Sequence, residues 1–202
     1  MKNIVIAGTS GVGKTFLEQE LEKAGLTFQL PKYTNRPSRP GENSNKTLCL
    51  APPEFEALNL SDAFFFTLDY GGYNYGWKRI DLLAHVNLAS TLAITLKDLA
   101  RFLSNNREFL PVLLVIDDSD LPLLEKRLYA REKFKAQTVQ KQNEIKAKIG
   151  ERLRLARQEI RQNDDFRKLV KSYRGLVFSI KDDLTIFDEV IPEIKKSLGK
   201  LF

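Results

Sequence analysis

An eight-residue segment near the start of the sequence constrains the fold more than any other feature. It matches the phosphate-binding loop pattern G-x-x-x-x-G-K-S/T at every fixed position. Its residues are Gly8, Thr9, Ser10, Gly11, Val12, Gly13, Lys14 and Thr15. Residues 3–7 predict a short buried strand before it, and residues 16–23 predict an amphipathic helix after it. This order predicts an α/β fold of the P-loop NTPase class, with three layers and a parallel sheet.

The same segment predicts a site for the phosphates of a nucleotide. Successive backbone N–H groups of such a loop point at the bound anion, and the following helix adds its positive N-terminal end. We expect Lys14 to reach the β- and γ-phosphates and the Thr15 hydroxyl to bind Mg²⁺, so ATP and Mg²⁺ are the expected cofactors. The alternative interpretation is a chance glycine-rich turn.

Composition narrows the remaining chemistry. The 202 residues are 43% hydrophobic, which is enough for one α/β domain, and the formal net charge of +6 suits a polyanionic ligand. With one cysteine, Cys49, and one histidine, His85, the sequence excludes a disulfide framework and a metal site of thiolates and imidazoles. We assign no chemistry to these two residues. Neither a signal peptide nor a membrane-spanning run is visible, so we expect a cytoplasmic protein without a membrane partner.

A loop rich in proline and arginine follows the first helix, over residues 31–42. Arginine forks bind phosphate in bidentate fashion, so Arg36 and Arg39 indicate a clamp for an anionic second substrate. An ordinary solvated loop is the alternative. Further along, residues 64–75 predict an aromatic-rich edge strand and turn, in which Tyr75 either packs in the core or offers a ring and a hydroxyl to a ligand.

Several segments, in the same order along nearly the whole chain, resemble guanylate kinases. The sequence K-Y-T-N-R-P-S-R-P-G-E at residues 32–42 looks like the family's S-H-T-T-R-x-P-R-x-G-E, and G-Y-N-Y-G at 72–76 resembles its G-N-Y-Y-G turn. Residues 127–131 match R-L-x-x-R, and residues 152–159 match R-L-x-x-A-x-x-E. The resemblance implies a core of residues 1–30, 77–126 and 172–202, an acceptor-binding subdomain of residues 31–76, and a lid near residues 127–171.

The resemblance also implies roles for individual residues. Arg36, Arg39 and Tyr75 would hold the phosphate of the acceptor, and Arg127 would join the loop residues 8–15 at the nucleotide. Phosphoryl transfer needs fixed cations over the transferred group. We therefore expect a catalytic set made of Lys14, Arg36, Arg131 and Arg152.

The buried strand predicted over residues 110–118 ends in two acids, Asp117 and Asp118. An acid at the end of such a strand is typical of a residue near Mg²⁺. The resemblance instead aligns this segment with the family's entry into the lid, where the acids would be a helix N-cap pair.

The positions at which guanylate kinases bind guanine are occupied by other residues here, namely Lys32, Phe66, Thr95 and Trp77. Asp69 is the nearest acid and could serve as a shifted base-binding residue. The other interpretation is an acceptor without guanine, as in ribose 1,5-bisphosphate phosphokinases. We expect ATP-dependent phosphotransfer to a phosphorylated small molecule, GMP being the first acceptor and a sugar phosphate the alternative.

Two other classes of function stay open. Guanylate-kinase-like domains of scaffold proteins bind partners without catalysis, but they typically lack the phosphate loop that is complete here. The basic helical region 133–171 suits nucleic acid less well than it suits a solvated helix face. The sequence gives no indication of an oligomeric state.

Overall fold

The computed structural model describes residues 3–39, 42–84, 87–132, 138–182 and 184–199. Its strands are β1 (Ile4–Gly8), β2 (Thr27–Gln29), β3 (Lys32–Thr34), β4 (Thr47–Cys49), β5 (Phe64–Tyr70), β6 (Tyr73–Lys78), β7 (Ala89–Ile94), β8 (Leu110–Val115) and β9 (Leu176–Ser179). Its α-helices are α1 (Lys14–Lys23), α2 (Pro52–Leu60), α3 (Arg79–Leu83), α4 (Leu96–Asn105), α5 (Leu121–Arg131), α6 (Val139–Arg161), α7 (Asn163–Ser172) and α8 (Ile191–Gly199).

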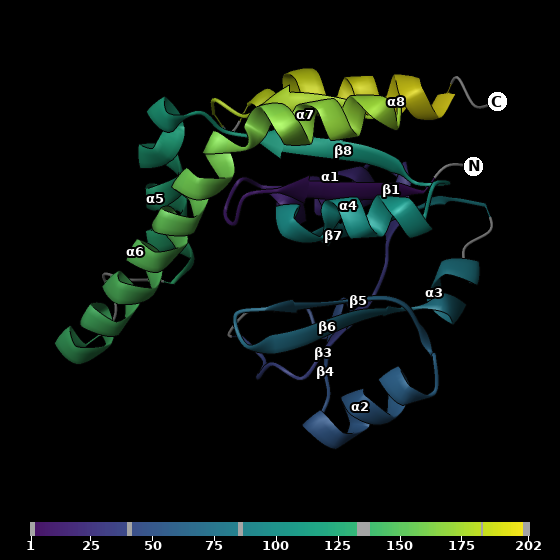
Figure 1. The fold of residues 1–202 in the computed structure, drawn as a ribbon, viewed down its shortest axis with the longest axis horizontal. Coiled ribbons are helices and arrows are strands. Elements are labelled where there is room, and N and C mark those ends of the chain that lie inside the picture. Colours follow the sequence, from purple (N-terminus) through teal and green to yellow (C-terminus); the bar gives the residue numbers. More distant parts are fainter. Residues whose placement is uncertain (1–2, 40–41, 85–86, 133–137, 183, 200–202) are drawn as a thin grey trace.

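The larger sheet is parallel throughout and has five strands in the order β2-β7-β1-β8-β9. β1 is central, with Ile6 opposite Ala93 of β7 on one side and opposite Val112 of β8 on the other. Helices connect the strands and cover the sheet, which confirms the expected α/β P-loop NTPase fold (Figure 1).

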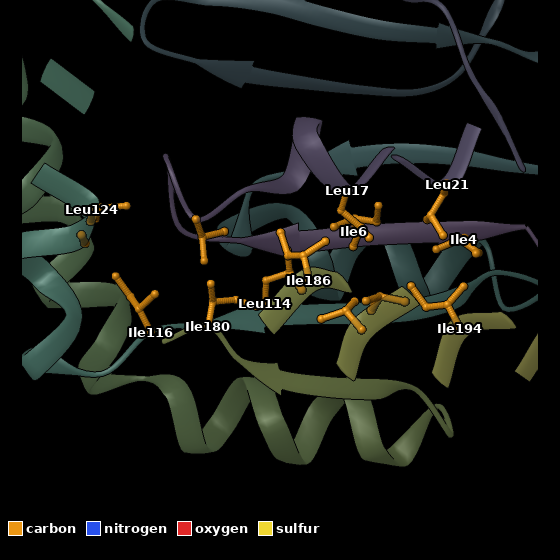
Figure 2. Close-up of a cluster of buried hydrophobic side chains, with 14 of the residues drawn as sticks. Ile4, Ile6, Leu17, Leu21, Leu114, Ile116, Leu124, Ile180, Ile186 and Ile194 are labelled. Atoms are coloured by element: carbon orange, nitrogen blue, oxygen red, sulfur yellow. The ribbon is translucent and has the colours of Figure 1, made fainter. Parts of the chain in front are cut away.

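Alternation along β1 and β8 divides the core into two layers. Ile4, Ile6 and Leu114 point to one face, where they pack with Leu17 and Leu21 of α1 and with Ile194 of α8 (Figure 2). Val5, Ala7, Leu113 and Val115 point to the other face, toward α4 and α7. Every residue of β1 and β8 is buried, because helices cover both faces of the sheet. The sequences of these two strands are therefore continuous hydrophobic runs.

A second sheet has four strands in the order β4-β3-β6-β5. Its strands lie between β2 and β7 in the sequence, and the sheet is separate from the larger one in space (Figure 1). One of its faces packs with α4: the rings of Phe66 and Phe102 meet edge to face with centroids 4.8 Å apart. Its other face carries Tyr33 and Phe64, which pack with Phe55 of α2. A β-bulge between Phe64 and Phe66 allows these two residues to face opposite sides.

Some boundaries differ from the sequence-based expectation. The strand expected over 110–118 ends at Val115, before the two acids, and the loop expected over 31–42 contains the short strand β3. The last helical segment begins with a π-helical turn over Ile186–Val190. Pro192 follows directly in α8, and its missing N–H cannot continue an α-helical ladder from the preceding turn.

Among the described residues, no helix is long and apolar enough to span a bilayer.

Candidate functional site

The glycine-rich loop between β1 and α1 has the backbone conformation that its glycines make possible. Gly11 has φ +92°, a value that other residues rarely adopt, and a Cβ there would lie 2.8 Å from Cδ1 of Leu124. At Gly8 a Cβ would lie 2.5 Å from the carbonyl oxygen of Leu114. The loop therefore approaches β8 and α5 closely. It ends at Gly13, the N-cap of α1, and Thr15 is exposed in the first turn of that helix.

Lys14 lies over this loop. Its ammonium donates hydrogen bonds to the carbonyl oxygens of Gly8 and Thr9, the latter at 2.9 Å. Burial lowers the pKa of Lys14 to about 8, although the carboxylates of Glu159 and Glu18 oppose the shift. A lysine held in this way can exchange its carbonyl partners for phosphate oxygens.

Glu18 and Glu159 reach the loop lysine from two helices. Glu18 follows it by one turn on α1, and burial raises the pKa of its carboxyl to about 7 against the pull of Lys32 and Lys14. Glu159 comes from α6, and burial likewise raises its pKa, opposed by Lys14 and by the Thr9 hydroxyl. The end of α6 thus lies against the phosphate loop, and α5 and α6 stand at that end of the sheet (Figure 1).

Helices α5 and α6 carry three of the expected arginines, and one of them contacts the loop. Arg127 donates a hydrogen bond of 3.2 Å to the carbonyl oxygen of Val12. Arg131 and Arg152 both lie near one carboxylate oxygen of Glu132, at 3.7 and 3.5 Å. Burial, and then the charges of Arg152 and Arg39, lower the pKa of Arg131. Two guanidiniums share one carboxylate here, so the pair keeps a net positive charge.

Arg36 is fixed by the turn that follows β3. The Thr34 hydroxyl accepts a hydrogen bond of 3.1 Å from the Arg36 amide and donates one of 2.8 Å to the carbonyl oxygen of Asn74. The Arg36 guanidinium bonds both carboxylate oxygens of Glu42, and its charge interacts with the Tyr75 hydroxyl. Its Nε–H is buried without a hydrogen-bond partner among the described residues, which is a donor left for a ligand.

Arg39 is exposed, and its charge acts on both Arg131 and Lys32. The structure therefore brings together the residues expected at the two phosphates. We call Lys14, Arg36, Arg39, Arg131 and Arg152 the cation cluster.

Asp69 does not join the cation cluster. On the same strand, Phe66 and Leu68 pack against the core. Asp69 follows Leu68 directly, so its side chain points to the opposite face, where it lines a hollow with Phe55 and Asn59 of α2. Tyr75 belongs to the core-facing side, so the two residues lie on opposite faces of the sheet.

Asp117 is exposed and begins the short 3₁₀ turn η1 (Asp118–Asp120), where its amide bonds the Asp120 carboxylate at 3.1 Å. This is the N-cap arrangement, the second of the two interpretations of the acids after β8. Within the described ranges no group of three acids, histidines or cysteines could hold a metal ion by itself. The Thr15 hydroxyl can hold Mg²⁺ only together with nucleotide phosphates, and the exposed loop mouth fits that arrangement.

The residues at the positions of the guanine contacts are unsuited to a base. Phe66 and Trp77 are buried, and the Thr95 hydroxyl donates a hydrogen bond of 2.6 Å to Asp98. Lys32 lies with its ammonium 6.0 Å from the centroid of the Tyr75 ring.

Sequence reasoning gave no role to the acids of this site, Glu18, Glu42, Glu132 and Glu159. Glu18 had a local signal, because residues i and i+4 of a helix share a face. Glu42 and Glu159 end two of the motifs quoted for the resemblance, whereas Glu132 joins the site only through helix packing. His85 lies outside the described residues.

No family model matches the sequence. A guanylate kinase of Deinococcus radiodurans is 27% identical over 169 residues, which are 83% of this chain and 66% of that protein. Guanylate kinases from two strains of Thermus thermophilus are 39% identical over 77 residues, which are 37% of this chain and 34% of theirs. The fold matches a crystal structure of guanylate kinase from Anaplasma phagocytophilum with a TM-score of 0.66 and 16% identity, over 99% of this chain and 86% of that one. The chain is similar to guanylate kinases in sequence and in fold.

The chain spans less than two thirds of the length of the sequence relatives it matches. Its likeness to the Anaplasma structure, at 16% identity, is a likeness of fold.

Proposed function

We propose that this chain transfers the γ-phosphoryl group of ATP to a phosphorylated small-molecule acceptor. One observation carries the proposal: Arg131 lies on α5, whose Arg127 bonds Val12 of the phosphate loop at 3.2 Å, and the charge of Arg131 interacts with both Lys14 and Arg39. A cation within reach of both a donor and an acceptor phosphate is what in-line transfer between them requires. The names of the sequence relatives support the same class of reaction.

In this proposal the loop amides of residues 8–15 and Lys14 hold the donor phosphates, with Arg127 beside them. Mg²⁺, bound with the nucleotide and the Thr15 hydroxyl, would neutralise charge on the β- and γ-phosphates. Arg36, Arg39 and Tyr75 hold the acceptor in the four-stranded sheet, and Arg131 and Arg152 stabilise the transferred group from α5 and α6. No protein base is needed, because an acceptor phosphate oxygen is already an anionic nucleophile.

GMP is the reference acceptor, since the relatives are guanylate kinases. Ribose 1,5-bisphosphate is the second candidate, because Lys32 places an ammonium where a base would need mixed donors and acceptors. The alternative of a binding module without catalysis predicts nucleotide or partner binding and no turnover.

The test is an ADP-release assay with ATP, Mg²⁺ and a panel of GMP, dGMP, AMP, UMP, CMP and ribose 1,5-bisphosphate. We expect turnover with at least one acceptor and loss of that turnover in Lys14→Ala. The far-UV circular dichroism of Lys14→Ala should equal that of the parent protein. A folded parent protein that turns over no acceptor, or a Lys14→Ala variant with near-normal activity, would overturn the proposal.

A further inference from the structure

Lys32 is a mostly buried cation for which the proposed phosphoryl transfer has no use. It lies in β3, where Tyr33 faces α2 and packs with Phe64 at a centroid distance of 5.9 Å. Alternation turns Lys32 to the opposite face, the one that carries Tyr75 and Trp77. The 6.0 Å separation of the Lys32 ammonium from the Tyr75 ring agrees with this placement.

The ammonium of Lys32 forms neither a hydrogen bond nor an ion pair within 4.0 Å in the described part of the chain. Charges surround it at longer range: Glu18 and Glu42 attract it, and Arg36 and Arg39 repel it. Burial lowers its pKa, which shows that keeping the charge there is unfavourable. Binding of an anion would remove that penalty.

The chemistry of this face limits what Lys32 can bind. An ammonium has three donors and no acceptor. The same face of the sheet carries the buried rings of Phe66 and Trp77, and the Thr34 hydroxyl is already bonded to Asn74. The edge of a purine carries donors as well as acceptors, whereas a phosphate or carboxylate offers acceptors alone. The face therefore suits an anion better than a base.

Lys32 lies in β3, outside the loop that holds the Arg36 guanidinium, although the charges of Arg36 and Arg39 reach it. Three residues lie between Lys32 and Arg36, and an extended chain rises about 3.3 Å per residue, so their backbones are at most roughly 13 Å apart. The Arg36 guanidinium is tied to Glu42 and to the carbonyl oxygen of Pro37, within its own loop. One phosphate held by Arg36 and Arg39 leaves Lys32 available for another group.

We propose that Lys32 is a specificity-determining residue that binds a second anionic group of the acceptor. The acceptor class is a small molecule with two separated anions, such as a sugar bisphosphate, and the inference rests on the proposed phosphotransferase function. The second anion can be a phosphate or a carboxylate.

The test compares acceptors that differ by one anion. The kcat/KM values for ribose 1,5-bisphosphate and ribose 1-phosphate are measured for the parent protein, Lys32→Met and Lys78→Met, and 6-phosphogluconate tests a carboxylate as the second anion. Lys78 is the matched control, because its ammonium lies 4.3 Å from the Tyr33 ring on the α2 face of the same sheet. We expect the parent protein to prefer the bisphosphate by on the order of tenfold to a hundredfold. In Lys32→Met this preference should fall to within about threefold through a higher KM, and in Lys78→Met it should persist.

Two results would overturn the inference: a parent protein that prefers GMP to every bisanionic acceptor, or a Lys32→Met variant that keeps the preference. The first of these leaves the phosphotransferase proposal standing. If no acceptor is turned over, the phosphotransferase proposal fails. The role of Lys32 is then tested by the shift in melting temperature that ribose 1,5-bisphosphate causes in the absence of ATP. Equal shifts for the parent protein and Lys32→Met would then refute its role, and a shift lost only in Lys32→Met would support it.

Discussion

Arg36 and Glu42 form a nearly buried ion pair in which Nη2 of the arginine bonds both carboxylate oxygens, at 2.6 and 2.7 Å. Although burial alone would raise it, the Arg36 guanidinium keeps the pKa of Glu42 below its ordinary value. The pair orients the arginine and leaves its Nε–H for a ligand.

We therefore predict that Glu42→Gln lowers the free energy of unfolding by about 1–3 kcal/mol, because a buried guanidinium loses its counter-charge. The KM for the acceptor should rise, since the fork is no longer held in place. Urea denaturation and steady-state kinetics measure the two effects. Glu193→Gln, which removes an exposed carboxylate paired with Lys196, is the control and should change neither.

A second prediction concerns the pH dependence of ATP binding. The ammonium form of Lys14 binds phosphate, and the pKa of Lys14 is about 8 with Glu159, Glu18, Arg131 and Lys32 around it. Bound phosphate favours the charged form and raises this pKa. The affinity for ATP should thus fall as the pH rises above about 8, by up to tenfold per pH unit, and binding should take up a proton.

Calorimetric titration at pH 7 to 9.5, in buffers that differ in ionisation enthalpy, measures both the affinity and the proton uptake. Lys14→Arg keeps its charge throughout this range and should show a flat profile. An unchanged affinity of the parent protein between pH 7 and 9.5 would contradict the placement of Lys14 at the phosphates.

A third prediction uses two glycines with opposite surroundings. Gly11→Ala introduces a Cβ 2.8 Å from Leu124 at a φ of +92°, so it should destabilise the protein by more than about 1 kcal/mol and weaken ATP binding. Gly150→Ala adds a Cβ with nothing within 4 Å on an exposed turn of α6, and it should stabilise the protein by up to about 1 kcal/mol. Thermal unfolding of both variants measures the difference. A stable Gly11→Ala variant with normal nucleotide affinity would show that the loop tolerates another backbone conformation.

A fourth prediction separates two arginines on α6. Arg152 shares Glu132 with Arg131, whereas Arg154 pairs with Glu151 at the surface. If Arg152 stabilises the transferred phosphoryl group, Arg152→Met should lower kcat on the order of a hundredfold or more while the KM values change little. Arg154→Met should behave as the parent protein does. Similar losses in both variants would indicate a general effect of charge on α6.

The sequence predicted the fold best where the signal was local. The strand, loop and helix around Lys14 were placed within two residues, since glycine positions and apolar runs are read directly from the chain. The sequence did not predict which side chains of the second sheet point to which of its two faces. Asp69 is the nearest acid to Tyr75 in the aromatic stretch, yet strand register and the bulge at Phe64–Phe66 put it on the other face. Motifs in the sequence contain Glu42 and Glu159, but the pairing of Glu42 with Arg36 depends on loop closure, and the approach of Glu159 to Lys14 depends on the packing of α6.

The edge-to-face packing of Phe66 on Phe102 has a consequence for how the molecule melts. One face of the smaller sheet belongs to the same hydrophobic cluster as α4 and one face of β1 and β8. Arg101 of α4 also donates a hydrogen bond to the carbonyl oxygen of Thr67. Detaching that sheet would expose several large rings to water at once. Differential scanning calorimetry should accordingly record a single heat-absorption peak, in which both sheets denature as one cooperative unit.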